Sequence, residues 1–389
     1  VEKEKRIGGL AVKVSHTIEG AQVRPYIEEL VERVRGNKNI EVFTDAALTS
    51  FQGYKGNFTS TIEVGPDKAR RTIEHGVAIL ATGAHEYKPV EYGYSTNERI
   101  ITQLELDEII ENPPSGKDPR NWKQVVMIQC VGSRNGQNPN CSRICCQSAV
   151  KHALRLKEIN PEINVYILYR DMRMYSMLED FYMEARRKGV VFARFDMNKE
   201  PEVRTDGEGA AVVFRDPILQ RPVMVAADAV VLSAATLPND TDKLASLIKV
   251  PRNAYGFFME AHAKLRPVDF ASEGIFLCGT AHSPKLISES ITQALGAASR
   301  AGSFLAGKTL SVGGAVAHVD SERCAGCLVC VRVCPYKIPR INEMRVSEIN
   351  EALCQGCGTC VSECPARAIQ LSHYEDCQVH TSIHALMAG

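Results

Sequence analysis

Eight cysteines near the C-terminus repeat one spacing twice. The stretch CAGCLVCVRVCP at 324–335 recurs as CQGCGTCVSECP at 354–365, and each copy reads C-x2-C-x2-C-x3-C-P. Three thiolates spaced by two residues can wrap one side of a cubane iron–sulfur cluster, and a more distant thiolate closes the other side. In two-cluster ferredoxins of bacterial type, the fourth cysteine of each run ligates the other cluster. The spacing therefore predicts two [4Fe–4S] clusters with crossed ligands.

The crossed pattern assigns each cluster its own four thiolates. One set is Cys324, Cys327, Cys330 and Cys364, and the other is Cys354, Cys357, Cys360 and Cys334. Zinc is the alternative, but it usually takes two C-x2-C pairs, which these runs of four fit poorly. Residues 316–389 carry six Lys or Arg and eight Asp or Glu. Because this charge is nearly balanced, we expect weak steering of a redox partner and a fixed complex with it.

Four more cysteines follow an apolar strand in the stretch QCVGSRNGQNPNCSRICC. They are Cys130, Cys141, Cys145 and Cys146, with the spacing C-x10-C-x3-C-C. A helix beginning after this loop would direct free N–H groups and its positive dipole end at it, which suits an anionic thiolate-ligated cluster as it suits a phosphate. Cys141 and Cys145 could share one face of that helix. From spacing alone, a structural zinc or cysteines that simply lie near the surface explain the loop equally well, although adjacent cysteines favour iron–sulfur modestly.

Two glycine turns after strand-like runs could approach a nucleotide cofactor closely. GVAILATGAHEYKP at 76–89 ends a strand at Ala81, Thr82 and Gly83, and GIFLCGTAHSPK at 274–285 ends another at Gly279 and Thr280. A helix N-terminus shortly after the second turn can meet a flavin edge or a phosphate. Each signal is weak alone, and only their order along the chain carries weight.

The opening VEKEKRIGG resembles the end of a second βαβ strand, where an acidic residue binds ribose hydroxyls. Glu2 is the candidate acid, although a solvated charge explains it equally well, and Gly8 and Gly9 follow it. The chain opens on Val and shows no apolar signal region, so we expect a fragment or a natural start upstream.

The elements that would position these residues follow an α/β pattern over 1–315, typical of one doubly wound sheet or two in series. Helical periodicity predicts helices over 23–36 and 288–307. The expected strands are NIEVFT, STIEV, GVAILATG, VVMIQ, NVYILYR, VVFARF, AAVVFR, AVVLSA and GIFLCG. Near 313–320 this periodicity fades, which predicts a domain boundary.

Bulk composition excludes several classes of protein. The chain has 389 residues, 44% hydrophobic and 24% charged, with a formal net charge of zero. No bulk field therefore recruits nucleic acid or an anionic membrane, and the apolar runs are too short to span a bilayer. Fourteen cysteines without a secretory signal favour metal binding in a reducing cytoplasm over disulfides.

With these residues in hand, the chain resembles the A subunit of heterodisulfide reductase and its bacterial relatives, which are built on a thioredoxin-reductase-like flavoprotein. The resemblance covers nearly the whole chain, and its most specific element is QCVGSR with CSRICC. It also includes VEKEKRIGG, the GNF of KGNFTSTI, ILATGA, EARRKGV, the segment 279–294 and the ferredoxin tail.

The resemblance implies an FAD/NAD(P)-type two-domain flavoprotein with a C-terminal α+β 2[4Fe–4S] ferredoxin domain. Its expected domains are FAD-binding residues 1–105 and 241–315, a nicotinamide-type domain at 106–240 converted to a [4Fe–4S] site, and the ferredoxin domain at 316–389. The implied cofactors are FAD and three [4Fe–4S] clusters, one of them at Cys130–Cys146. The chain departs from the fullest family form because the first βα turn of the FAD domain and a cluster-binding insertion are absent.

The implied function is electron transfer between FAD and the clusters in a complex, including flavin-based bifurcation as in methanogens. Implied partners are B- and C-type subunits and a hydrogenase, formate dehydrogenase or similar donor. Lys285 is expected near the flavin, where it could stabilise the reduced anion, or else is an ordinary surface lysine; His282 and Glu184 are weaker candidates. Cys278 is expected to be a buried small residue and Cys377 a spare thiol. The alternatives are an NAD(P)H-dependent flavin dehydrogenase and a non-catalytic electron carrier.

Overall fold

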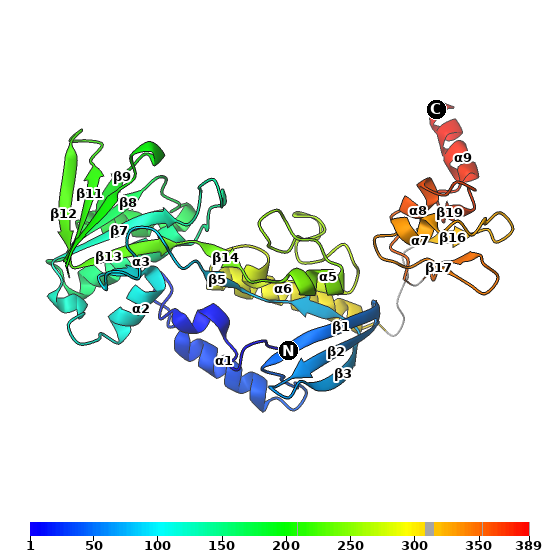
Figure 1. Ribbon diagram of the computed structural model, residues 1–389, viewed down its shortest axis with the longest axis horizontal. Coiled ribbons are helices and arrows are strands. Elements are labelled where there is room, and N and C mark those ends of the chain that lie inside the picture. Colours follow the sequence, from blue (N-terminus) through cyan, green and yellow to red (C-terminus); the bar gives the residue numbers. More distant parts are fainter. Residues whose placement is uncertain (208, 308–314, 352, 389) are drawn as a thin grey trace.

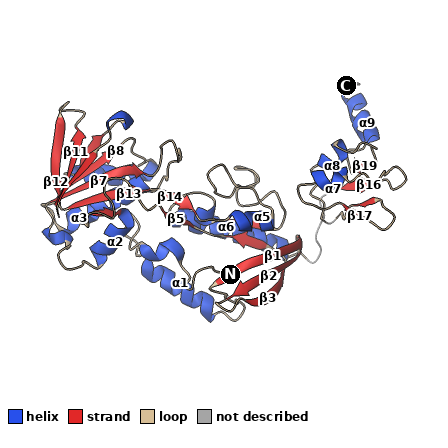
Figure 2. Cartoon of the chain, in the orientation of Figure 1, coloured by secondary structure: helices blue, strands red, loops and turns tan. Residues whose placement is uncertain are grey.

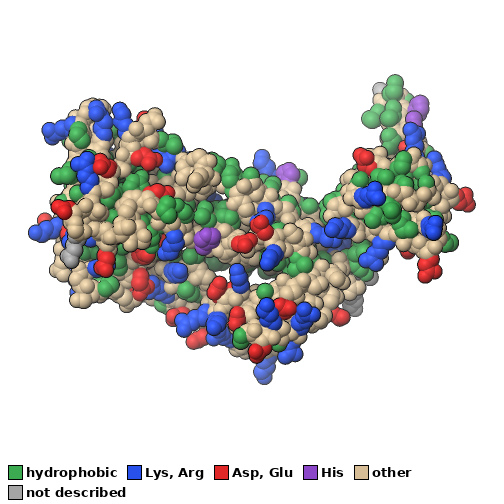
Figure 3. Space-filling view, in the orientation of Figure 1, with side chains coloured by type: hydrophobic (Ala, Val, Ile, Leu, Met, Phe, Trp, Pro, Cys, Tyr) green, Lys and Arg blue, Asp and Glu red, His purple; other side chains and the backbone are tan. Residues whose placement is uncertain are grey.

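The computed structural model describes residues 1–207, 209–307, 315–351 and 353–388. Figure 1 shows three parts along the long axis: a twisted sheet at one end, a middle part around helix α6 (Ile287–Leu305), and a small C-terminal lobe. Strands and helices occur together in all three parts (Figure 2). On the face shown in Figure 3, Lys and Arg side chains are interspersed with Asp and Glu, in line with the zero net charge.

Five parallel strands form the sheet at one end, in the order β6-β13-β7-β8-β9. They are β6 (Ile100–Thr102), β7 (Gln124–Val131), β8 (Asn164–Tyr169), β9 (Val191–Arg194) and β13 (Ala229–Ala234). β13 is buried along its whole length, and so is β7 apart from its first residue. Both are almost continuously apolar because both faces of the sheet are covered.

The two faces of this sheet are covered by different structures. One face packs against α2 (Gln103–Glu111), α3 (Cys145–Ile159) and α4 (Glu179–Arg187). The other packs against an antiparallel sheet of β10 (Glu202–Asp206), β11 (Gly209–Arg215) and β12 (Pro222–Ala227). β11 buries every second residue, as a strand does when one of its faces packs on a core. Helices therefore cover one side only, unlike in a fully doubly wound fold.

The middle part is built on a short parallel pair, β4 (Ala78–Leu80) with β15 (Ile275–Leu277), which contacts α6. Its other elements are the antiparallel strands β1 (Ala46–Tyr54), β2 (Asn57–Val64) and β3 (Ala69–His75), with η1 (Gly9–Lys13), α1 (Arg24–Gly36) and α5 (Asp242–Ile248). β5 (Ala84–Glu86) and β14 (Thr236–Pro238) pair antiparallel where the chain passes between this part and the five-stranded sheet.

The C-terminal lobe has two similar halves. Its strands are β16 (Ala317–Val319) paired with β19 (Ile369–Leu371), and β17 (Arg340–Ile341) paired with β18 (Ser347–Glu348). Its helices are α7 (Val329–Val333), α8 (Thr359–Ser362) and the terminal α9 (Asp376–Met387). The short helices α7 and α8 each follow the first two cysteines of one copy of the repeat, so the sequence repeat is also a structural repeat.

Most, though not all, of the expected elements are present. The helix expected over 23–36 is α1, and eight of the nine strand-like runs contain a strand. The prediction for NIEVFT is wrong: residues 39–44 lie outside any strand, because this run has only isolated backbone hydrogen bonds, such as that from Glu2 N to Phe43 O (2.7 Å). The sequence predicted one doubly wound sheet or two in series, and the described residues contain one large parallel sheet. None of the described helices combines the length and apolarity needed to cross a bilayer.

A buried polar cluster holds the N-terminal segment against α2 and α3. The Asp107 carboxylate is 2% exposed and accepts from Lys151 Nζ at 2.6 Å and from the Ser15 hydroxyl. His152 is also buried, and its Nδ1 lies 2.5 Å from Oε1 of Gln103. Burial, with the charge on Lys151, lowers the pKa of His152 to about 4 from the ordinary 6.5.

We therefore expect the free energy of unfolding to fall with decreasing pH in a window set by His152. The unfolded chain takes up this proton near pH 6.5 and the folded chain only near 4, so the stabilisation is present above 6.5 and is lost below it. Denaturant titration should show a loss of about 1 kcal/mol between about pH 7.5 and about pH 5.5. His152→Gln should flatten this slope and His380→Gln, on an exposed face of α9, should leave it; equal slopes in all three would contradict the assignment.

Candidate metal and cofactor sites

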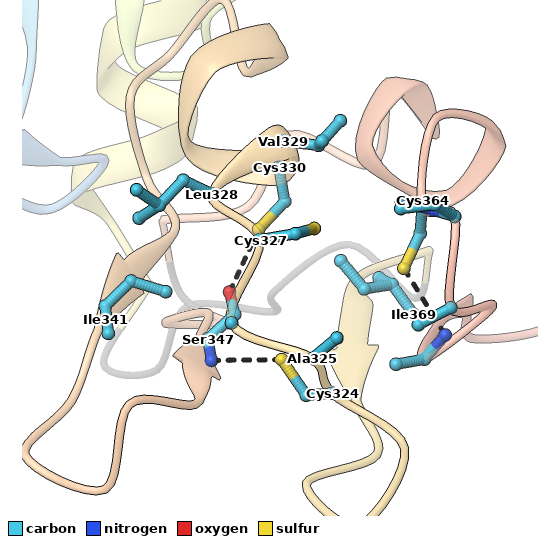
Figure 4. A pocket seen from close by; sticks show the side chains of 14 residues that line it. Cys324, Ala325, Cys327, Leu328, Val329, Cys330, Ile341, Ser347, Cys364 and Ile369 are labelled. Carbon is cyan, nitrogen blue, oxygen red and sulfur yellow. Dashed lines mark hydrogen bonds between the residues drawn. The ribbon is translucent and has the colours of Figure 1, made fainter.

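The first predicted set of thiolates surrounds one pocket of the C-terminal lobe. Cys324, Cys327, Cys330 and Cys364 all line it, together with Ser347 and apolar side chains. Figure 4 shows that Cys364 reaches this pocket from the second copy of the repeat while the other three come from the first. The fold therefore brings the fourth cysteine of the second copy to the three cysteines of the first copy, as the spacing predicts.

The second set surrounds a separate pocket in the same lobe. Cys354, Cys357 and Cys360 line it with Cys334 of the first copy. Burial, with the charges of the other three thiols, raises the pKa of Cys360 to about 11. Mutual repulsion of this kind is expected where several thiols face one space.

Backbone groups already point at the sulfurs of both pockets. Ala317 N–H donates to Cys354 Sγ at 3.3 Å, and Ser347 and Ala368 N–H donate at 3.4 Å to Cys324 and Cys364. Hydrogen bonds of this kind orient thiolate ligands and tune cluster potentials. The side chains present therefore fit two cubane clusters.

Glycine is required at equivalent positions of the two copies. Gly326 and Gly356 have φ of 63° and 64°, and a Cβ on either would lie 2.5 Å from Arg345 O or 2.2 Å from Ala315 O. Only a residue without a side chain lets the backbone turn this tightly between the first and second ligands.

The four thiols of the loop between β7 and α3 also converge. Burial raises the pKa of Cys130, and the charges of Cys146 and Cys141 add to this, while Arg170 and Arg134 oppose it. Cys145 is buried, and its pKa is raised by its hydrogen bond with Cys146 and by burial, with the charges of Cys130 and Cys141 adding to that effect. The thiols of Cys130 and Cys145 thus each lie near the other cysteines of the loop, as ligands of one cluster would.

One detail predicted for this loop is wrong. α3 begins at Cys145, so Cys141 lies in the loop and shares no helix face with it. The cause is the backbone of Arg143, whose φ of 59° breaks helical geometry. No side chain caps α3, so the N–H groups of its first turn remain available to the space that the cysteines enclose.

In the described residues, no three Cys, His, Asp or Glu side chains are arranged to hold a single metal ion. A cubane asks for another arrangement, since each thiolate binds a different iron and the sulfurs surround a space. An observation at the loop fits such a group: buried polar atoms of Gln129, Arg134, Gln147 and Arg170 have no hydrogen-bond partner. Buried polar groups are seldom left unpaired, so these atoms indicate a polar or charged occupant.

The loop at residues 130–146, the cysteine loop, packs directly on the connection to the middle part. A Cβ on Gly132, whose φ is 68°, would lie 2.2 Å from Cδ1 of Tyr87. The buried Ser142 hydroxyl accepts from Thr236 N at 2.9 Å. Tyr87 adjoins β5 and Thr236 begins β14, so the β5–β14 pair sets the position of the cysteine loop.

The turns proposed for flavin binding lie side by side. β4 and β15 pair in parallel, which places Gly83 (φ 72°) so that a Cβ on it would lie 3.9 Å from Thr280 Oγ1. Gly279 also has a positive φ, of 70°, with open space where a Cβ would stand, and its N–H donates to Gln293 Oε1 at 2.9 Å. Ala81 and Thr82 follow β4 at the same edge. These small residues leave a cradle that a bulky side chain would fill, which fits close approach of a cofactor.

Lys285 stands beside this cradle and is not an ordinary surface lysine. It is 8% exposed, and its Nζ donates to Gly279 O at 2.8 Å and lies 3.4 Å from His282 Nδ1. Burial lowers its pKa to about 8 from 10.5. His282 is fixed by Glu260 at 2.7 Å and Gln293 at 3.0 Å, and burial lowers its pKa too.

Other candidates lie elsewhere. Glu2 Oε1 accepts from Glu4 N at 2.9 Å, and Gly8 packs on Val12 and Ile27 near α1. Gly9 begins η1. Glu184 pairs with Lys188 along α4 at 2.8 Å, which explains it as a helix-surface ion pair. Cys278 is buried and Cys377 exposed.

A contact that the sequence did not suggest joins the cysteine loop to the flavin-side turn. Arg143, two residues after Cys141, forms an ion pair with Glu289, and its Nη2 also donates to Tyr175 Oη at 3.1 Å. Glu289 accepts from Leu286 N at 2.8 Å, at the start of α6 and next to Lys285. The partners are far apart in sequence, and a lone Arg and Glu carry no local signal, so only the fold reveals the pair.

Comparisons with known proteins match both the C-terminal lobe and most of the chain. Residues 317–368 match the family described as a 4Fe-4S dicluster domain. The A subunit of the H2:CoB–CoM heterodisulfide, ferredoxin reductase of Methanothermobacter thermautotrophicus is 38% identical over 331 residues, which are 81% of this chain and 50% of that protein. An iron–sulfur A subunit of the CoB–CoM heterodisulfide reductase of Methanopyrus kandleri is 37% identical over 349 residues, 83% of this chain and 51% of that protein.

The chain belongs to the A-subunit family of heterodisulfide reductase. As a member of that family it spans about half the length of the curated relatives it matches. Its fold is similar to thioredoxin reductase from Lactococcus lactis, with a TM-score of 0.50 and 16% identity over 78% of this chain and 89% of that one. The predicted thioredoxin-reductase-like fold and the predicted dicluster domain are both confirmed.

We expect Gly132→Ala to disturb the cysteine loop of this heterodisulfide reductase homologue. Its Cβ would enter the ring of Tyr87, and its left-handed backbone disfavours any side chain. Iron analysis of the anaerobically purified protein should show a loss approaching one cluster, about four irons per chain. Gly136→Ala, in the same loop with open space at Cβ, is the matched control; an equal loss in both variants would mean that the Tyr87 contact does not position the thiols.

Proposed function

We propose that this chain is an iron–sulfur flavoprotein component of a heterodisulfide-reductase-like complex, an oxidoreductase that passes electrons between FAD and three [4Fe–4S] clusters. The observation that carries the proposal is the Arg143–Glu289 ion pair, which fastens the cysteine loop to the segment that bears Lys285. An electron carrier held by that loop would lie next to the flavin turns.

Residues 1–105 and 241–315 form the proposed flavin domain, 106–240 the proposed cluster-bearing domain, and 316–389 the ferredoxin domain. FAD exchanges two electrons and each cluster one, which is the chemistry these groups supply when bound. The chain's own task is to hold them: Gly83, Gly279 and Thr280 offer the close approach, and the twelve predicted cysteines offer thiolates at three separate places.

The partners follow from the relatives. Their names describe subunits of assemblies that act on the CoB–CoM heterodisulfide and, in one case, on H2 and ferredoxin. We propose that this chain likewise works with B- and C-type subunits and a hydrogenase, formate dehydrogenase or similar donor. In its most specific form, the proposal is that electrons branch at the flavin onto two paths, including by flavin-based bifurcation.

An NAD(P)H-dependent flavin dehydrogenase is the alternative function. It would need a phosphate-binding loop after β7, whereas residues 130–146 carry four cysteines there. Reduction of the flavin by NAD(P)H alone, without partners, would favour that alternative. A bare electron carrier differs in lacking flavin, so FAD measured per chain separates it from the proposal.

The deciding experiment is anaerobic purification with partners, followed by iron and FAD analysis and an EPR-monitored redox titration. We expect about twelve irons per chain and three cubane signals. Cys146→Ser should remove one cubane signal. It should leave the two signals of the C-terminal lobe, the dicluster lobe, whose ligands lie elsewhere. Two cubanes in the unaltered protein would contradict the assignment at Cys130–Cys146.

Lys285 gives the flavin assignment a pH signature. Burial lowers its pKa to about 8, so its charge favours electron-rich flavin below that pH and is lost above it. The flavin midpoint potential should fall more steeply as pH rises through this value, and Lys285→Gln should remove the break. Lys264→Gln, at an exposed position, should retain it; a break that persists in Lys285→Gln would place Lys285 away from the flavin.

A further inference from the structure

The buried polar atoms without partners gather around one feature of the chain. The structure has eight such side-chain atoms in the residues it describes, and five of them flank the cysteine loop. They are Gln129 Nε2 and Oε1, Arg134 Nη1, Gln147 Oε1 and Arg170 Nε. Gln129 directly precedes residues 130–146, Arg134 lies within them, and Gln147 directly follows them. Arg170 bonds to the backbone oxygens of Ser133 and Arg134, so all four residues adjoin the cysteine loop.

Gln129 is the residue directly before the first ligand, and it is 1% exposed. Side chains alternate along a strand, so Gln129 lies on the same face of β7 as Met127. Met127 packs in one core cluster with Cys146 and Ala149 of α3. The Gln129 amide therefore faces the first turn of α3, where two of the thiols lie. Buried polar atoms without hydrogen-bond partners destabilise a fold, so both polar atoms of Gln129 indicate an occupant of this space.

Two guanidinium groups are fixed beside the same thiols. Arg134 donates from Nη2 to Asp171 at 2.6 Å and leaves Nη1 buried and free of partners. Arg170 is 8% exposed and is held by Ser133 O at 3.4 Å and Arg134 O at 2.6 Å. Their charges act on Cys130, which is the electrostatic sign of proximity. Both cations are thus held in place by backbone and carboxylate contacts, with donors to spare.

The two pockets of the dicluster lobe are different. Their linings are apolar apart from the thiols and a few neutral polar groups, and they include no Lys or Arg among the described residues. Their sulfurs accept mainly from backbone N–H groups. If all three sites hold clusters of one kind, their electrostatic surroundings are unequal.

We propose that Gln129, Arg134 and Arg170 are positioning residues that donate hydrogen bonds and positive charge to the cluster at Cys130–Cys146 and raise its reduction potential above those of the two dicluster sites. Reduction adds one negative charge to a cluster, so nearby cations and donors favour the reduced form. The inference rests on the proposed function. On this proposal, the cluster at Cys130–Cys146, the loop cluster, has the higher reduction potential and accepts electrons from the flavin more readily. The two clusters of the dicluster lobe have the lower reduction potentials.

The test is an EPR-monitored redox titration of the intact complex, in which the loop cluster is recognised as the signal absent from Cys146→Ser. Arg134→Gln should lower its ratio of reduced to oxidised cluster at fixed ambient potential about tenfold, which is 59 mV for one electron. The dicluster signals should not move. Arg194→Gln is the matched control, since Arg194 pairs with the same Asp171 carboxylate at 3.4 Å but is 67% exposed; we expect little shift there.

Gln129→Leu separates a role toward the cluster from a role in folding. Leu is similar in size and has no polar group, so Gln129→Leu should leave the fold intact. In the intact complex it should shift the reduction potential of the loop cluster in the same direction as Arg134→Gln. A loop cluster with a potential at or below the dicluster potentials would overturn the inference. So would equal shifts in Arg134→Gln and Arg194→Gln. Finding only two cubanes would instead overturn the proposed function itself.

Discussion

The fold depends on backbone that turns left-handed at the cysteines. Four thiols can enclose one space only if the chain reverses within a few residues, and L-amino acids resist the conformation that does this. Yet Cys130, Arg134 and Arg143 have φ of 66°, 55° and 59°, and in the dicluster lobe Leu328 has φ of 66°. Strain of this kind persists where surrounding contacts over-determine it. Here those contacts are the Ser142–Thr236 hydrogen bond, the packing of Gly132 on Tyr87, and the Arg143–Glu289 pair.

The same constraint explains how much of the fold and of the ligand sets could be predicted from the sequence. The ligand sets of the dicluster lobe follow from local spacing, because each copy of the repeat fixes three thiolates within one turn and a short helix. The strands β7 and β13 are evident from unbroken apolar runs. The position of Cys141 outside α3 was not predictable from the i, i+4 spacing, because it depends on the left-handed backbone conformation of Arg143.

Contacts between distant segments were the least visible. In the sequence, Gln129 is a polar residue at a strand end with no local signal of a role. Only the core cluster that Met127 shares with Cys146 indicates what Gln129 faces. Lys285 could equally have been a surface lysine, until burial and the Gly279 carbonyl placed it beside the flavin-side turns. Glu2, Gly8 and Gly9 keep their candidacy from sequence order alone, because the structure places them near α1 and residues 40–46.

The arrangement of the three parts gives the proposed carriers a linear order. The middle part lies between the sheet that bears the cysteine loop and the C-terminal lobe (Figure 1). It touches both: Arg143 of the loop pairs with Glu289 on α6, and Lys249 Nζ at the end of α5 donates to Tyr336 O at 2.9 Å, next to Cys334. Tyr336 lines the pocket of the second set of thiolates. The middle part is therefore in contact with both regions that carry candidate cluster ligands. A flavin bound in the proposed middle part would thus lie between the cysteine loop on one side and the second set of thiolates on the other.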